Sequence, residues 1–144
     1  MNLDKIYEQA EQEDKLVAVV KYPYQTPEVV TIDKGLAPIQ KTVGGNIDVV
    51  YLPDIDDIHG FCNDEGLFIG MEPNFYRPEY KDAIVGPAVF FSSGYDGSSE
   101  SLSREQVKKI TNFLTANSVK DYGEFYMNVK TDFACYKPKS VPEM

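Results

Sequence analysis

The sequence predicts an α+β fold: a mostly antiparallel sheet with hairpins, two helices packed on one face of it, an N-terminal helix and a C-terminal aromatic helix. Three patterns lead to this prediction. Short runs rich in β-branched residues recur along the chain, as strands require. Two segments, 36–43 and 103–114, have apolar residues at helical spacing. Turn-forming residues between neighbouring runs indicate hairpins.

The first third of the chain predicts a helix and a hairpin. Residues 2–12 have apolar side chains at helical spacing, and Asn2 can cap this amphipathic helix. Residues 16–20 form a continuous apolar run, which we expect to be a strand buried on both faces. We expect it to pair with residues 28–32, because the prolines of segment 22–27 exclude that segment from a ladder.

A double glycine separates the next helix from the next strand. Residues 36–43 predict a helix and residues 47–52 a strand. We expect Gly44 to end the helix in the left-handed region, where a β-branched residue would be strained. Gly45 leads into the strand, and we expect replacement of this glycine by alanine to destabilise less.

The middle of the chain predicts a second hairpin. Residues 58–62 and 67–69 are short apolar runs that flank a turn closed by a glycine. We expect residues 70–82 to be irregular. Residues 83–91 form the most apolar stretch, and Gly86-Pro87 within it predicts a bulge or an edge position.

The C-terminal third predicts two helices. Ser103 and Gln106 form a capping box at the start of the first helix. Residues 122–133 carry aromatic side chains at roughly helical spacing. We expect one domain over residues 1–144, which consists of an appended helix (1–14), an α+β core (15–118) and an aromatic C-terminal extension (119–144).

Composition restricts the classes of function. The net charge of −9 argues against direct binding to duplex nucleic acid, which needs clustered lysine and arginine. No apolar run approaches the roughly 18–20 residues of a membrane span, and the N-terminus lacks the pattern of a signal peptide. We therefore expect a cytoplasmic protein that does not bind membranes. Cys62 and Cys135 are expected to be free thiols.

The acidic residues are unevenly distributed. Between Thr42 and Tyr76 the chain has seven acids and no lysine or arginine. Such a segment is most often a solvated surface, but it can also bind a basic partner. The acids are Asp48, Asp54, Asp56, Asp57, Asp64, Glu65 and Glu72.

The sequence contains no convincing catalytic or metal-binding motif. Residues 54–65 match an EF-hand loop at positions 1, 3 and 12, but position 6 is His59 instead of glycine. His59 and Cys62 have the spacing of half a zinc site, yet Cys135 is the only further soft ligand. On a strand these two side chains would point to opposite faces, which disfavours a nucleophile–base pair. We expect no cofactor, no metal and no enzymatic activity.

Five motifs occur along the chain in the same order as in a known family. They are Ile39–Val50, Cys62–Gly66, Gly70–Asn74, Asp82–Gly86 and Ser101–Gln106.

In these motifs the chain resembles domain of unknown function 3846 over roughly residues 15–114. It departs from the family pattern at Glu72, where a proline is usual, and at Phe75, where a basic residue is common. The resemblance implies a small accessory protein of a phage, plasmid or integrative element of bacteria. It implies no reaction, because the family has no catalytic residues to transfer.

Two hypotheses follow. In the first, the protein binds a host or element-encoded protein through an acidic face, and an anti-defence role by imitation of DNA phosphates is one form of this hypothesis. The acidic face consists of Asp54, Asp56, Asp57, Asp64 and Glu65.

In the second, the chain is a small-molecule-binding or enzymatic domain whose site lies on irregular loops. Its pocket would be lined by Tyr51, His59, Asn74, Tyr76 and Arg77. The sequence leaves the partner and the oligomeric state open.

Overall fold

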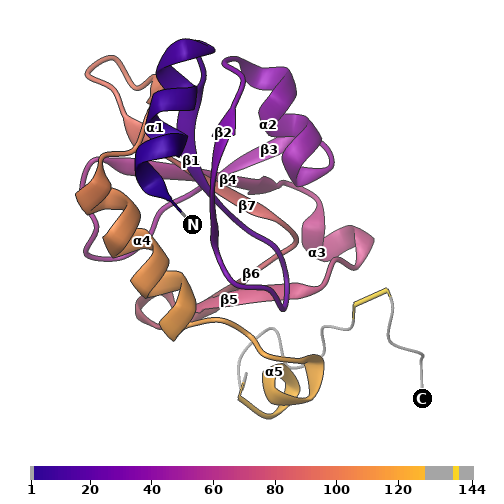
Figure 1. The fold of residues 1–144 in the computed structure, drawn as a ribbon. Coiled ribbons are helices and arrows are strands. Elements are labelled where there is room, and N and C mark those ends of the chain that lie inside the picture. The colour runs from indigo at the N-terminus through magenta and orange to yellow at the C-terminus, as the bar shows by residue number, and fades with distance from the viewer. Residues whose placement is uncertain (1, 129–137, 140–144) are drawn as a thin grey trace.

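The main sheet is antiparallel throughout. The computed structural model describes residues 2–128 and 138–139. The strand order of the main sheet is β2-β1-β7-β4-β3 (Figure 1). The short strand β8 pairs with the end of β7. The predicted α+β class is confirmed. The strands are β1 (Leu16–Lys21), β2 (Glu28–Ile32), β3 (Ile47–Val50), β4 (Ile58–Asn63), β7 (Ala88–Ser93) and β8 (Ser99–Glu100).

Helices cover both faces of this sheet. Helices α1 (Leu3–Gln12) and α4 (Arg104–Ala116) lie on one face, and α2 (Leu36–Val43) lies on the other (Figure 1). The predicted helices are therefore present, but the expectation that they share one face is wrong. The central strands are apolar at successive positions, so that both faces of the sheet exclude water and both need a cover.

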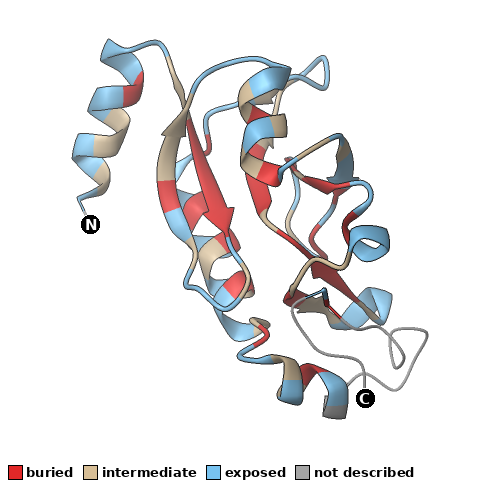
Figure 2. Cartoon of the chain, turned by 90° about the vertical axis from the view of Figure 1, so that its right-hand side faces the viewer, coloured by how far each residue is buried: buried red, intermediate tan, exposed pale blue. Residues whose placement is uncertain are grey.

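The two cores follow from the alternation of side chains along the strands. In β1, Val17 and Val19 join the core under α1 and α4, whereas Ala18 and Val20 join the core under α2. Figure 2 shows the buried residues concentrated in the strands and on the inner sides of the helices. The prediction that residues 16–20 are buried on both faces is confirmed.

The segment after β4 is a single helical turn instead of the predicted second hairpin. Helix α3 (Gly66–Ile69) follows β4 directly. The Asn63 side-chain carbonyl accepts a hydrogen bond from the Glu65 N–H, which turns the chain. Gly70, with φ of 77°, then ends the turn. A run of three apolar residues has no periodicity that distinguishes a strand from a helix, which explains the wrong prediction.

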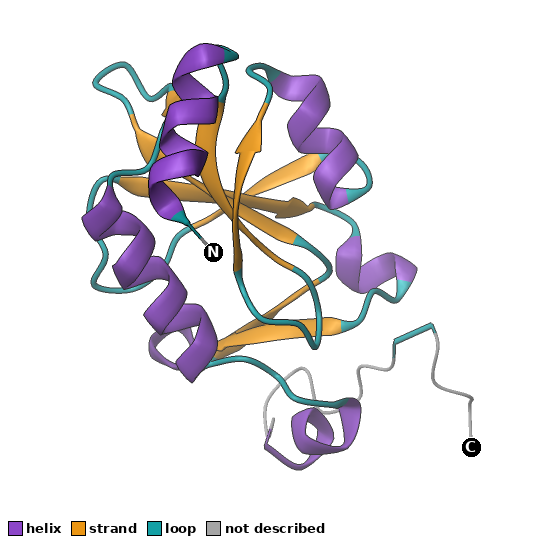
Figure 3. Ribbon diagram, in the orientation of Figure 1, coloured by secondary structure: helices purple, strands orange, loops and turns teal. Residues whose placement is uncertain are grey.

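Residues 70–82 are more regular than the sequence suggests. Strands β5 (Pro73–Arg77) and β6 (Asp82–Val85) form a separate two-stranded sheet, joined by the 3₁₀ turn η1 (Pro78–Tyr80) (Figure 3). Phe75 of β5 is fully buried in the core under α4. The prolines, which made the sequence suggest an irregular segment, lie at the start of β5 and in the turn between β5 and β6.

The chain passes from the small sheet to the main sheet at Gly86-Pro87. Gly86 has φ of 77°, and its N–H donates to the Glu72 carbonyl over 2.8 Å. The predicted bulge or edge position is thus a change of sheet between β6 and β7, which together form the apolar stretch 83–91.

The predicted helix ends are confirmed. Asn2 accepts a hydrogen bond from the Asp4 N–H at the start of α1. Ser103 and Gln106 form both hydrogen bonds of the capping box of α4. The predicted aromatic helix is present as α5 (Tyr122–Asn128), and the remainder of that prediction lies outside the described residues.

The two glycines after α2 are needed for different reasons. Gly44 has φ of 83° and lies in the left-handed region, as predicted. At Gly45 a Cβ atom would lie 2.9 Å from the Asn63 side-chain nitrogen. Asn63 is buried and is held by hydrogen bonds to Val43 and Glu65. The structure therefore adds a steric constraint at Gly45 that the sequence does not reveal.

We predict that Gly44→Val lowers the free energy of unfolding by about 1–3 kcal/mol, because a β-branched residue is strained at positive φ. Gly44→Asn should lower it less, because asparagine tolerates this region. Urea denaturation of both variants tests the prediction. If the valine variant is as stable as the asparagine variant, the left-handed conformation of Gly44 does not limit stability.

Candidate functional site

Three of the predicted acids lie on the loop between β3 and β4. Asp54, Asp56 and Asp57 are all exposed. Asp54 and Asp57 have φ of 61° and 60°, a region that aspartate tolerates better than most residues. The Asp57 carbonyl accepts the Ser93 N–H over 2.8 Å, which fixes the end of this loop to β7.

The other two predicted acids lie at the opposite end of β4. Asp64 and Glu65 are exposed, and the Asp64 N–H donates to the Asn46 carbonyl. Since β4 has six residues, the two groups are about 20 Å apart. Asp48, also exposed, lies on the edge strand β3 between them. We call this row the acidic edge: Asp48, Asp54, Asp56, Asp57, Asp64 and Glu65.

An exposed apolar turn lies beside one end of the acidic edge. In α3, Phe68 is 91% exposed, and Leu67 and Ile69 are 48% and 43% exposed. We call these three residues the apolar turn. The Lys139 N–H donates to the Gly70 carbonyl just after α3, so this described part of the C-terminal segment lies next to it. Sequence analysis missed the apolar turn, because an apolar run of three residues is commonly a buried strand.

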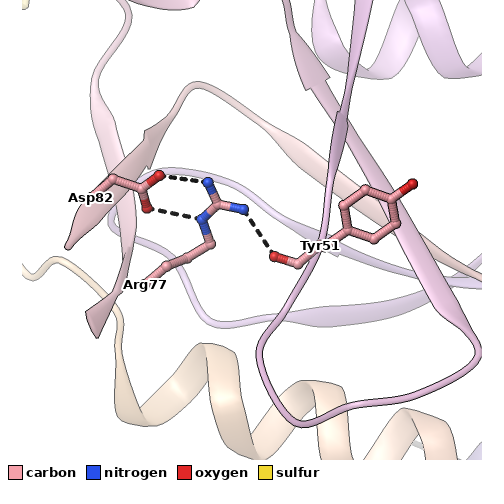
Figure 4. A network of polar contacts seen from close by, with 3 residues as sticks. All are labelled: Tyr51, Arg77 and Asp82. Carbon is pink, nitrogen blue, oxygen red and sulfur yellow. Dashed lines mark hydrogen bonds and ion pairs between the residues drawn. The ribbon is translucent and has the colours of Figure 1, made fainter. Parts of the chain in front are cut away.

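Arg77 connects the acidic loop to the small sheet. Its guanidinium donates to both carboxylate oxygens of Asp82 and to the Tyr51 carbonyl over 2.9 Å (Figure 4). Its central carbon lies 4.6 Å from the centre of the Tyr80 ring. The Tyr51 ring points away from Arg77 and is exposed. Arg77 therefore fixes the backbone where the acidic loop begins.

A surface cavity of about 500 Å³ lies beside this loop. The Asp54 and Glu79 side chains hydrogen-bond, which raises the pKa of Glu79 above its usual value. Lys109 also faces the cavity and forms an ion pair with Glu105 at 3.3 Å. The lining residues are Pro53, Asp54, Ile55, Pro78, Glu79, Lys109, Asn112, Phe113 and Asn117.

Asn74 lies in a buried polar contact with Lys21. The Lys21 ammonium donates to the Asn74 side-chain oxygen and to the Tyr22 carbonyl, each over 2.9 Å. The Asn74 side-chain nitrogen donates to the carbonyls of Lys21 and Gly86. Burial lowers the pKa of Lys21 to about 8. These bonds join the end of β1 to the small sheet.

The five residues of the alternative pocket do not converge on one site. Arg77 donates a hydrogen bond to the Tyr51 carbonyl. Asn74 is buried against Lys21, and the Tyr76 ring stacks on Phe125 at 6.3 Å.

The remaining residue, His59, lies on the face covered by α2 and contacts Phe61 and Phe91. Its two ring nitrogens lie 2.7 Å from the hydroxyls of Ser93 and Ser99.

His59 and Cys62 point to opposite faces of β4, as predicted. Cys62 belongs to the core under α4, and its thiol is free. Burial, with a smaller contribution from Asp48, raises the pKa of this thiol to about 11. In the described part of the chain, no group of three or more histidine, cysteine and carboxylate side chains is placed so that it could hold a metal ion. Cys135 lies outside the described residues.

Comparisons with known proteins give one result. A family model described as Domain of unknown function (DUF3846) matches residues 15–115. Searches of curated proteins and of solved structures returned no match. Among the described residues, no helix combines the length and the apolar composition needed to cross a bilayer.

We predict that Lys21 makes stability depend on pH. Its pKa is about 8 in the folded chain and 10.5 in the unfolded one, so between these values the unfolded state binds more protons. The free energy of unfolding should therefore increase as the pH rises through this window, and this increase should be lost as the pH falls through the pKa of the folded state. Relative to Lys21→Met, the wild type should gain about 2 kcal/mol between pH 7.5 and 9.5.

Urea denaturation of both proteins at the two pH values measures this difference. The comparison with Lys21→Met is necessary because the raised pKa of Cys62 acts in the opposite direction and is common to both proteins. If the difference in free energy of unfolding between the wild type and Lys21→Met does not change with pH, the assigned pKa of Lys21 is wrong.

Proposed function

We propose a protein-binding function for this chain, which belongs to the DUF3846 family. The partner is a basic protein, encoded by the host or by the mobile element that carries this chain. The observation that supports the proposal is the position of the apolar turn next to the acidic edge. Exposed carboxylates with an exposed phenylalanine beside them combine the two properties of a specific interface.

The two parts of this surface have different roles in binding. The acidic edge steers a basic partner toward the surface, an effect that falls with ionic strength. The apolar turn supplies buried area on contact, which salt does not screen. Phe68 is the strongest candidate for an anchor, because a largely exposed phenylalanine has most of its surface still to bury.

A more specific form of the proposal is an anti-defence role by DNA mimicry. Five carboxylates lie in two groups at the ends of β4, about 20 Å apart, and Asp48 lies between these groups on the edge strand β3. A protein that binds DNA phosphates would meet negative charge along this edge. In this form the acidic edge contributes most of the affinity, whereas in the general form the apolar turn does.

We predict that Phe68→Ala weakens partner capture at 0.3 M salt by about tenfold, since loss of a buried aromatic anchor commonly costs more than 1 kcal/mol. The double variant Asp56→Lys/Asp57→Lys should weaken capture mainly at low salt. The measurement is affinity capture from host lysate with each variant as bait, followed by binding kinetics with the isolated partner.

Tyr95→Ala is the matched control, because Tyr95 is a fully exposed aromatic residue on another loop. Capture that is lost equally with Tyr95→Ala and Phe68→Ala would contradict the assigned surface. Capture that is unaffected by any of the three changes would contradict it as well.

A further inference from the structure

His59 lies between two serine hydroxyls on the α2 side of the main sheet. Its Nδ1 atom lies 2.7 Å from the Ser93 hydroxyl, and its Nε2 atom lies 2.7 Å from the Ser99 hydroxyl. Strand pairing explains the arrangement. His59 is opposite Phe91, and Ser93 follows two residues later on the same face, directly opposite Ser99.

The three side chains form a row that starts at a cavity. Ser99 lines a cavity of about 380 Å³, and His59 behind it is only 7% exposed. Ser93 is on the far side of the imidazole ring. The Ser99 hydroxyl therefore lies at the cavity and contacts one nitrogen of the imidazole ring, and the Ser93 hydroxyl contacts the other nitrogen. This is the order of nucleophile, base and orienting group in hydrolases that use serine.

The cavity can hold a small apolar group. Its lining includes Leu16, Ile39, Ile47, Phe61 and Phe91. The start of α2 also lines it, and no side chain caps this helix terminus. The first backbone N–H groups of a helix have no partner within the helix and can donate to an anionic oxygen.

We propose that Ser99 and His59 are the nucleophile and base of an esterase site for small esters with an apolar acyl group. This inference goes beyond the proposed binding function and does not depend on it. It is an alternative to the expectation that the chain has no enzymatic activity. Ser93 is a positioning residue: its hydroxyl oxygen accepts a hydrogen bond from the Nδ1–H of His59, so that Nε2 carries no proton and can accept the one from Ser99.

The reaction needs only water as a second reactant. The Ser99 oxygen bonds to the ester carbonyl carbon, while the Ser99 proton moves to Nε2 of His59. The bond from the carbonyl carbon to the leaving oxygen then breaks, and the alcohol takes that proton. Water attacks the acyl-serine with His59 as base. This step releases the carboxylic acid and returns the proton to Ser99.

The ionisation of His59 is compatible with this role. Burial holds the pKa of His59 below its usual value, so the neutral imidazole predominates at pH 7. Asp33 and Lys34 are the charged residues among those that line the cavity, and Lys34 is paired with Asp14 at 2.7 Å. The rate should decrease at acid pH as His59 is protonated, with a midpoint below that of an unshifted imidazole.

The experiment uses the full chain with a fluorophosphonate probe and p-nitrophenyl butyrate. We expect the probe to label Ser99, as mapped by mass spectrometry, and Ser99→Ala to abolish labelling and hydrolysis. His59→Gln keeps hydrogen-bonding groups at this position but removes the base, and it should slow labelling by about 100-fold or more. Ser118→Ala is the matched control, because Ser118 is partly exposed like Ser99 but does not line this cavity.

Two results would overturn the proposal. One is a wild-type protein that remains unlabelled and hydrolyses the ester no faster than Ser99→Ala. The other is labelling spread over Ser98 and Ser99 that does not depend on His59 and does not fall at acid pH. Either result would mean that the two serines only satisfy the hydrogen bonds of a buried histidine. The labelling map of the wild type remains decisive even if a variant does not fold.

Discussion

The fold depends on one constraint: the central strands β1 and β7 are apolar on both faces. In these strands Val17, Ala18, Phe90 and Phe91 have no exposed surface. Because neighbouring side chains point to opposite faces, neither face can remain in water. Helices α1 and α4 exclude water from one face and α2 from the other, so the helices cannot gather on a single face. The polar features of the protein therefore lie at the ends and edges of the sheet.

A buried polar joint determines where these edges lie. Lys21 ends β1, and with Asn74 it links the main sheet to β5 and to the turn at Gly86. A shift of one sheet against the other would break these hydrogen bonds and leave buried polar atoms without partners, which costs free energy. The Lys21–Asn74 contact therefore favours one relative position of the two sheets. Arg77, two residues beyond Phe75 on the same strand, then fixes the start of the acidic loop through the Tyr51 carbonyl. The start of the acidic loop is thus attached to the small sheet, which the Lys21–Asn74 contact joins to the main sheet.

The candidate sites were predictable to different degrees. The five predicted acids are exposed because a carboxylate without a buried partner stays in water, so composition alone places them on the surface. Their division between the two ends of β4 depends on the length of that strand. The residues proposed for the alternative pocket do not converge. His59 lies on the α2 side of β4, whereas Asn74, Tyr76 and Arg77 lie on β5 and make separate contacts with Lys21, Phe125 and Asp82. The row of Ser99, His59 and Ser93 has no local sequence pattern, since 40 positions separate Ser99 from His59.

The sequence by itself determined the features that depend on neighbouring residues. These are the class of the fold, the first hairpin, the capped helix at Ser103 and the left-handed glycine at Gly44, which arise from local backbone preferences and hydrogen bonds. Only the tertiary structure decided which face each helix covers, that Gly86 is a change of sheet, and which side chains meet at His59. These features depend on strand order and register, which are set by packing between residues far apart in the chain. Single-residue periodicity does not encode such packing.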